Sequence, residues 1–163
     1  KELFLVDDQL TLYPVKKEHN NIDLPVISGL SGELGSATYG PNDLNLLKIA
    51  QYIIRQSIKI NKSLFNYISE INFSDSNNIL HVTSDDATPV YFVDCSIIET
   101  GNLGRNNARD INNSALRNAI DNNLTELNAF LKQVRVYKAS NSFKYIDMRY
   151  NGQVVVKNNL QAE

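Results

Sequence analysis

Few residues of this 163-residue chain belong to the types that perform metal or nucleophilic chemistry. Histidine occurs twice, as His19 in a charged loop and as His81 in an apolar stretch typical of a β-strand. A lone histidine in a strand is usually a sheet residue, because a metal site needs several ligands brought together. Cys95 is the single cysteine, which excludes an internal disulfide and favours a buried apolar role over that of a nucleophile. We therefore predict no metal site and no cofactor.

Carboxylates are the other candidates for chemistry, because two of them close together can act as general acid and general base. The chain offers Asp7-Asp8, Asp85-Asp86 and Asp94. Both pairs fall in expected hairpin turns, where aspartate hydrogen-bonds the backbone. The Gly-x-Ser-x-Gly and His-Glu-x-x-His motifs of hydrolases and zinc proteases are absent from the sequence. These observations favour a protein that is not an enzyme.

A glycine-rich stretch spans residues 29–41, with glycine at positions 29, 32, 35 and 40. It lacks the Gly-Lys-Ser/Thr ending of a phosphate-binding P-loop, and its spacing is not that of a dinucleotide-binding loop. We interpret it as a surface loop.

Composition bounds the remaining possibilities. The formal charge is −2, and lysine and arginine form no run longer than Lys16-Lys17, so nucleic acid is not an expected partner. No run reaches the roughly 18 apolar residues of a membrane span, so we expect this segment itself to be soluble. The chain opens on Lys1 and enters a strand almost at once. We therefore expect a piece of a longer protein, with any anchor or upstream domain before Lys1.

Hydrophobic periodicity predicts an alternation of strands and helices. Expected strands are residues 3–6, 10–15, 71–73, 79–83 and 90–93, with Pro25 restricting the apolar segment 24–29 to a sheet edge. Expected helices are 42–60, capped by Asn42 or Asp43, a short continuation at 63–68, and 114–134, capped by Asn113 or Ser114. Residues 95–113 are expected to be irregular. The pattern predicts an α+β fold in which two main helices pack on an antiparallel sheet.

The chain ends in a predicted β-hairpin, residues 143–157, because two strand-like runs flank Asn151-Gly152. A two-residue type I′ turn would place Arg149 opposite Val154 and Asp147 opposite Val156. One face would then carry Ile146, Met148, Tyr150 and Val155. No strand pattern follows the hairpin, so its second strand is predicted to be an open sheet edge.

Three motifs, in this order and separation, resemble the C-terminal β domain of the FtsQ/DivIB family of bacterial cell-division proteins. They are Leu5-Val6-Asp7-Asp8 at the start, Leu24-Pro25-Val26-Ile27-Ser28-Gly29, and Tyr145-Ile146-Asp147-Met148-Arg149-Tyr150, with Met148 where the family has leucine. The resemblance covers nearly the whole chain, so residues 1–163 are expected to form one such domain. The stretch 94–113 and the glycine-rich loop 29–41 are longer than the family pattern, and no residue correspondence is drawn there.

The resemblance implies a non-enzymatic scaffold of the divisome, in a single-pass protein of the bacterial inner membrane. A membrane helix and a POTRA domain would precede Lys1, and this domain would lie on the extracytoplasmic side at the septum. The implied partners are FtsB/DivIC-like and FtsL-like proteins, the former adding a strand to the last strand of the domain. Carried onto this chain, the partner-binding residues are Arg149, Tyr150, Gln153, Val154, Val155, Val156 and Lys157.

A second hypothesis belongs to another functional class. The chain would be a cell-envelope enzyme or carbohydrate-binding module that uses the glycine-rich loop with Tyr39, Asp94 or Cys95. This hypothesis requires a deep pocket lined by those residues.

Overall fold

The structure is a computed structural model that describes residues 3–16, 22–31, 39–83, 87–98, 109–136 and 143–158. Within these ranges the chain forms three α-helices, a two-stranded sheet and a six-stranded sheet, so the α+β class expected from the sequence is confirmed. In chain order the elements are β1 (Phe4–Val6), β2 (Leu12–Pro14), β3 (Val26–Ser28), α1 (Pro41–Ile60), α2 (Lys62–Tyr67), β4 (Ile68–Asn72), β5 (Asn78–Thr83), β6 (Pro89–Asp94), the 3-10 helix η2 (Cys95–Ile97), α3 (Ser114–Val136), β7 (Phe143–Asp147) and β8 (Val155–Asn158).

The larger sheet has the strand order β3-β4-β5-β6-β7-β8. The predicted antiparallel meander is confirmed in β4, β5 and β6, but the sheet as a whole is mixed because β3–β4 and β6–β7 are parallel pairs. Each parallel pair is separated in sequence by helices, α1 and α2 in one case and α3 in the other. Such a crossover returns the chain in its original direction, whereas a short turn reverses it.

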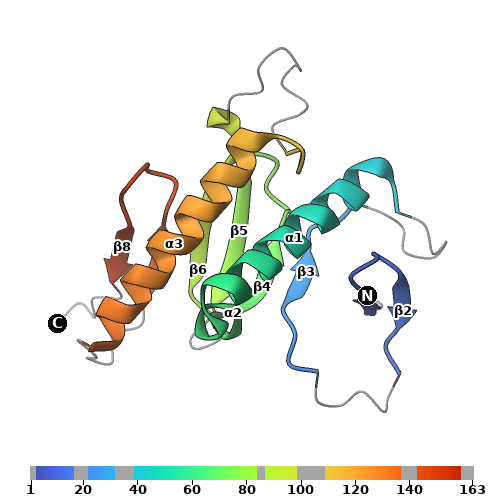
Figure 1. The fold of residues 1–163 in the computed structure, drawn as a ribbon, viewed down its shortest axis with the longest axis horizontal. Helices are drawn as coiled ribbons and strands as arrows, with labels where there is room; N and C mark the ends of the chain where they lie inside the picture. The colour runs from blue at the N-terminus through green and yellow to red at the C-terminus, as the bar shows by residue number, and fades with distance from the viewer. Residues whose placement is uncertain are drawn as a thin grey trace.

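The two long helices cover the same face of this sheet (Figure 1). α1 packs against α3, and α3 packs against β6. The apolar stripe predicted for α3 is buried at Leu116, Ile120, Leu124, Leu127 and Leu131, and its last member, Val134, is partly buried. The periodicity of α3 therefore reflects a core-facing surface, which fixes the sheet against the helices.

The helix starts differ in how they satisfy their first N–H groups. α3 is capped as predicted, because Asn113 Oδ1 accepts a hydrogen bond from Ala115 N at 2.9 Å. α1 instead begins at Pro41 after Gly40, without a side-chain cap, so the prediction of a cap at Asn42 or Asp43 is wrong. Proline suits the first helical position, because an N–H group there would have no acceptor within the helix. Asp43 is buried and accepts hydrogen bonds from the N–H and hydroxyl of Ser31, both at 3.0 Å.

The N-terminal hairpin β1–β2 forms the separate small sheet and lies beyond β3, at the opposite end of the molecule from β8 (Figure 1). Its turn is organised by Asp7, whose carboxylate accepts hydrogen bonds from Gln9 N at 2.9 Å and Thr11 N at 2.7 Å. These bonds, the one from Thr11 above all, lower the pKa of Asp7. The structural role predicted for Asp7 is confirmed. Gln51 Nε2 of α1 donates to the Asp7 carbonyl oxygen at 2.8 Å and holds the hairpin on the helix.

No helix within the described ranges combines the length and apolar character needed to cross a membrane.

Candidate functional site at the C-terminal sheet edge

β7 and β8 form the predicted hairpin, but with a longer connection than a two-residue turn. Asp147 lies opposite Val155, and Ile146 lies opposite Val156, so the predicted register is wrong by one residue. The chain leaves the hairpin ladder at Met148, whose side chain is buried and whose N–H donates to the Tyr91 carbonyl oxygen of β6 at 2.9 Å. Tertiary packing of Met148 therefore overrides the local preference for a tight turn.

Asn151 and Gly152 still make a turn within this connection. Gln153 N donates to the Tyr150 carbonyl oxygen at 3.0 Å, which closes a four-residue β-turn. Gly152 has a positive φ of 69°, whereas Asn151 does not. A positive φ at the third residue alone is the pattern of a type II turn, so the predicted type I′ turn is wrong.

β8 is the last strand of the sheet, and the direction of its free backbone groups follows from the neighbouring ladders. The bond from Met148 N to Tyr91 directs the backbone groups of Ile146 and Met148 towards β6, so those of Tyr145 and Asp147 face β8. Their opposite residues in β8, Lys157 and Val155, exchange both ladder bonds with them. The N–H and C=O groups of Val156, between these two pairs, therefore point outwards, and no described strand pairs with them. Asn158 lies opposite Phe143, beyond a register shift in the ladder.

The side chains predicted to bind a partner surround this edge. Tyr150 is 55% exposed, Val155 is 39% exposed and Val156 is 37% exposed, and Gln153 and Lys157 are exposed as well. Val154, in contrast, is partly buried and packs against the core. The predicted set therefore divides into an exposed group on β8 and its turn, and residues such as Val154 that hold the turn in place.

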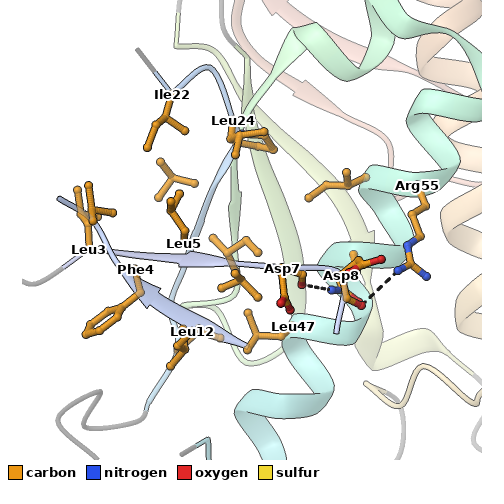
Figure 2. A pocket seen from close by; sticks show the side chains of 18 of the residues that line it. Leu3, Phe4, Leu5, Asp7, Asp8, Leu12, Ile22, Leu24, Leu47 and Arg55 are labelled. Atoms are coloured by element: carbon orange, nitrogen blue, oxygen red, sulfur yellow. Dashed lines mark hydrogen bonds between the residues drawn. The ribbon is translucent and has the colours of Figure 1, made fainter. Parts of the chain in front are cut away.

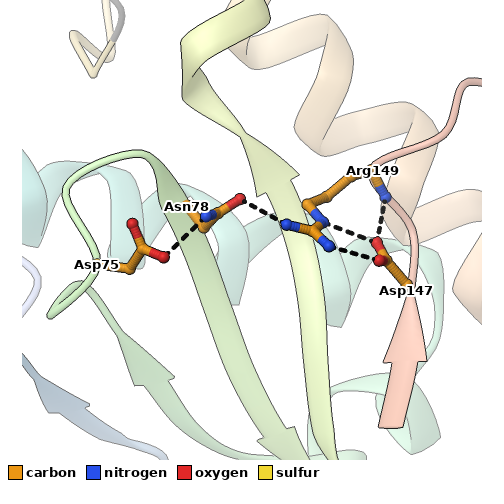
Figure 3. Close-up of polar contacts among 4 residues, drawn as sticks. All are labelled: Asp75, Asn78, Asp147 and Arg149. Carbon is orange, nitrogen blue, oxygen red and sulfur yellow. Dashed lines mark hydrogen bonds and ion pairs between the residues drawn. The ribbon is translucent and has the colours of Figure 1, made fainter.

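Arg149 is among the residues that are held in place (Figure 3). Its Nε and one terminal nitrogen bind both carboxylate oxygens of Asp147, at 2.9 and 2.6 Å, and its own N–H donates to the same carboxylate at 3.1 Å. The guanidinium also lies 4.6 Å from the centre of the Tyr91 ring and 3.4 Å from Asn78 Oδ1. The hydrogen bonds from Arg149 lower the pKa of Asp147. Arg149 thus ties the β7–β8 connection to β5 and β6, with 29% of its side chain exposed.

The residues considered for catalysis have structural roles. His81 is 1% exposed, stacks edge-to-face on Phe92 at 5.3 Å, and burial lowers its pKa to about 3. Cys95 is buried, and burial raises the pKa of its thiol. Asp94 caps η2, with its Oδ1 accepting from Ser96 N at 2.8 Å. Across the described ranges no three His, Cys, Asp or Glu side chains gather as a metal site would require.

Several predicted features lie outside the described residues. These are His19, the pair Asp85-Asp86, positions 32–38 of the glycine-rich loop, and residues 99–108 of the stretch 94–113.

Sequence reasoning missed Arg109, which lies at the described end of that irregular stretch. Its guanidinium donates to the carbonyl oxygens of Asp75, Asn78 and Phe73, the last two at 2.6 and 3.4 Å. It therefore holds the turn between β4 and β5. No local pattern announces such a residue, because its partners are backbone groups more than thirty positions away.

A hollow of about 630 Å³ lies at the other end of the molecule, between the β1–β2 hairpin, β3 and α1 (Figure 2). Its walls are mostly aliphatic, and Tyr39 is part of them, but Asp94 and Cys95 are not. The structure therefore does not bring together the residues that the enzyme hypothesis requires.

The chain was also compared with protein-family models, with curated proteins and with solved structures, and it matches none of them.

Proposed function

We propose that this chain is a β domain of the FtsQ/DivIB type, which acts as a non-enzymatic scaffold of bacterial cell division. It binds the extracytoplasmic segment of an FtsB/DivIC-like protein, together with an FtsL-like protein, by accepting a strand along β8. The observation that carries this proposal is the open edge, where Val156 directs its backbone groups away from the sheet. The membrane anchor and the extracytoplasmic location belong to the same proposal.

The chemistry of the edge suits strand addition. Each new backbone hydrogen bond contributes a net of about 0.5 to 1.5 kcal/mol, so a few of them supply part of a useful affinity. Exposed Tyr150, Val155 and Val156 add apolar and aromatic surface that a partner would bury. Asp147 neutralises Arg149, so the partner strand meets no unpaired buried charge beside the edge.

An NMR titration of the isotope-labelled chain with the extracytoplasmic segment of its own FtsB/DivIC-like protein tests the proposal. We expect the amide signals of residues 145–157 to shift first and to saturate. Absence of binding, or shifts confined to residues 29–41, would exclude strand addition at β8.

A further inference from the structure

The second open edge of the sheet is β3, which pairs with β4 alone among the described strands. Phe73 N donates to the Ser28 carbonyl oxygen at 3.0 Å, so Ser28 and, two residues earlier, Val26 direct their backbone groups towards β4. The N–H and C=O of Ile27 therefore face away from the sheet, towards the hairpin. The β1–β2 hairpin belongs to a different sheet and leaves this backbone pair unoccupied within the described residues.

Val26 and Ile27 of β3 are among the residues that line the hollow. Its volume of about 630 Å³ is that of a ligand pocket, which typically measures roughly 300 to 1,000 Å³. Several of the large aliphatic side chains that line it are exposed to solvent. The exposed members are Leu3, Val15, Ile22, Leu24, Val26 and Ile58. A contiguous apolar patch of this kind on a protein surface usually marks an interaction site.

The polar groups of the hollow lie at its α1 end. Asp7 and Asp8 both line it, and the Arg55 side chain donates to the Asp8 carbonyl oxygen at 3.4 Å. Two carboxylates against one guanidinium give this end a net negative charge. The Tyr39 hydroxyl in the same wall is buried and has no hydrogen-bond partner among the described residues.

We propose that this groove binds an extended segment of a second partner protein, which places its backbone beside Ile27, apolar side chains in the hollow and a lysine or arginine beside Asp7 and Asp8. The free backbone pair of Ile27 favours a peptide over a lipid, because an acyl chain offers nothing for an N–H and a C=O to bond. The net negative end disfavours an anionic head group for the same site. Matching the three residues of β3 needs three or four residues of the partner, roughly 10 to 14 Å of extended chain. The groove lies at the opposite end of the sheet from β8, so the domain would join two partners.

The test uses the isotope-labelled 163-residue chain and the synthetic peptide acetyl-KVTVTV-amide, with acetyl-EVTVTV-amide and dodecanoate as comparison probes. We expect saturable shifts at Leu3, Leu24 and Ile27 with the lysine peptide, and weaker binding of the other two probes. Shifts confined to residues 143–158, or dodecanoate or the glutamate peptide binding the groove as tightly as the lysine peptide, would overturn the proposal.

Substitutions of exposed residues locate the contact. Leu24→Glu, at a wall position 59% exposed, should weaken the lysine peptide about tenfold, because a carboxylate would be buried against the ligand. Ile97→Glu is the matched control, since Ile97 is 67% exposed and lies outside the hollow, and it should leave binding unchanged. Leu3→Glu, on the opposite wall, repeats the test if Leu24→Glu disturbs folding. Equal affinity in the wild-type, Leu24→Glu and Leu3→Glu chains would overturn the proposal.

Two charge variants test the basic residue of the partner. Asp8→Asn should weaken binding of the lysine peptide, and Arg55→Gln should strengthen it, each by about two- to threefold as expected for charges at a groove rim. An anionic ligand would give the opposite signs and would overturn the assignment. Because these readouts come from the groove and not from β8, they are independent of the function proposed for β8.

Discussion

The two ends of the sheet present the same kind of free backbone in different settings. At β8, the last strand of the sheet, the backbone groups of Val156 point outwards, and the exposed Val155 and Val156 lie on opposite faces. At β3 the backbone groups of Ile27 point away from the sheet, beside a groove that α1 and the N-terminal hairpin also line. A partner can therefore approach β8 freely, whereas at β3 its side chains must fit the hollow. The comparison teaches that β8 would select mainly through backbone pairing and β3 mainly through side-chain shape and charge.

One cross-strand row connects the two edges. Its members, each opposite the next in the strand pairing, are Ile27, Ile71, His81, Val90, Ile146 and Val156. The outward-facing residue at each end of the sheet thus belongs to the same row, with buried His81 in the middle. Changes at one end should affect one partner, whereas changes in the middle should affect both.

The largest effect is expected from Gly29→Ala, directly after β3. Gly29 has a φ of +77°, and a Cβ there would meet the Ser74 nitrogen and lie 2.6 Å from the Phe73 carbonyl carbon. Backbone strain and overlap together should lower the free energy of unfolding by about 3 to 5 kcal/mol, measured by urea denaturation. In chains that stay folded, peptide binding at the groove should be lost while binding at β8 remains.

Gly152→Ala is the matched control for that variant. Gly152 also has a positive φ, of +69°, but a Cβ there would meet nothing within 4 Å. Strain alone should lower the free energy of unfolding by about 1 to 2 kcal/mol. Equal losses in the two variants would show that β3 does not need the close approach of Gly29 to the chain after β4.

The second effect concerns His81 and both edges together. The folded protein holds its pKa at about 3, against a usual value near 6.5, because the buried ring cannot be charged. Between these pH values the unfolded chain binds a proton that the folded chain does not, so stability is fully present above pH 6.5 and falls as the pH decreases. The slope is about 1.4 kcal/mol per pH unit, so roughly 2 to 3 kcal/mol should be lost between pH 6 and pH 4.

Urea denaturation at several pH values, on the wild-type chain and on His81→Leu, measures this contribution. The carboxylates are common to both chains, so the difference between their pH profiles isolates the histidine. The His81→Leu chain should keep binding at both edges to lower pH. Parallel profiles would contradict the contribution of His81.

Sequence patterns predicted the elements well where the signal was local. The apolar stripe of α3, its cap at Asn113 and the meander of β4 to β6 each depend on residues close together in the chain. Asn151-Gly152 likewise gave a hairpin, but its register depended on Met148 bonding to Tyr91, more than fifty positions away. The parallel pairs and the groove were missed for the same reason, because α1, β3 and the N-terminal hairpin meet only in the folded chain.

The third effect is specific to β8. Val156→Pro removes one outward N–H and leaves the ladder between Val155 and Asp147 intact. Affinity for the FtsB/DivIC-like segment should fall about tenfold in isothermal titration calorimetry. A loss of this size is expected when one backbone hydrogen bond to the partner strand is removed. Binding of the lysine peptide at the groove should not change. Val155→Pro removes an N–H that faces β7, so it should lower the stability of the hairpin more than Val156→Pro does. Equal partner affinity in the wild-type and Val156→Pro chains would contradict the open edge.

The smallest effect comes from the ion pair that anchors β8 to the rest of the sheet. Asp147 and Arg149 are 7% and 29% exposed, so their pairing is only partly screened by water. A double-mutant cycle with Asp147→Asn, Arg149→Gln and the combined variant should give a coupling energy of about 1 kcal/mol in urea denaturation. Arg149→Lys should recover little of it, because lysine keeps the charge but not the two parallel bonds to the carboxylate. Partner affinity at β8 should follow the coupling energy, since the pair fixes the β7–β8 connection. Peptide affinity at the groove should not change, because neither residue lines the groove. Additive effects of the two substitutions would instead mean that the ion pair does not stabilise this connection.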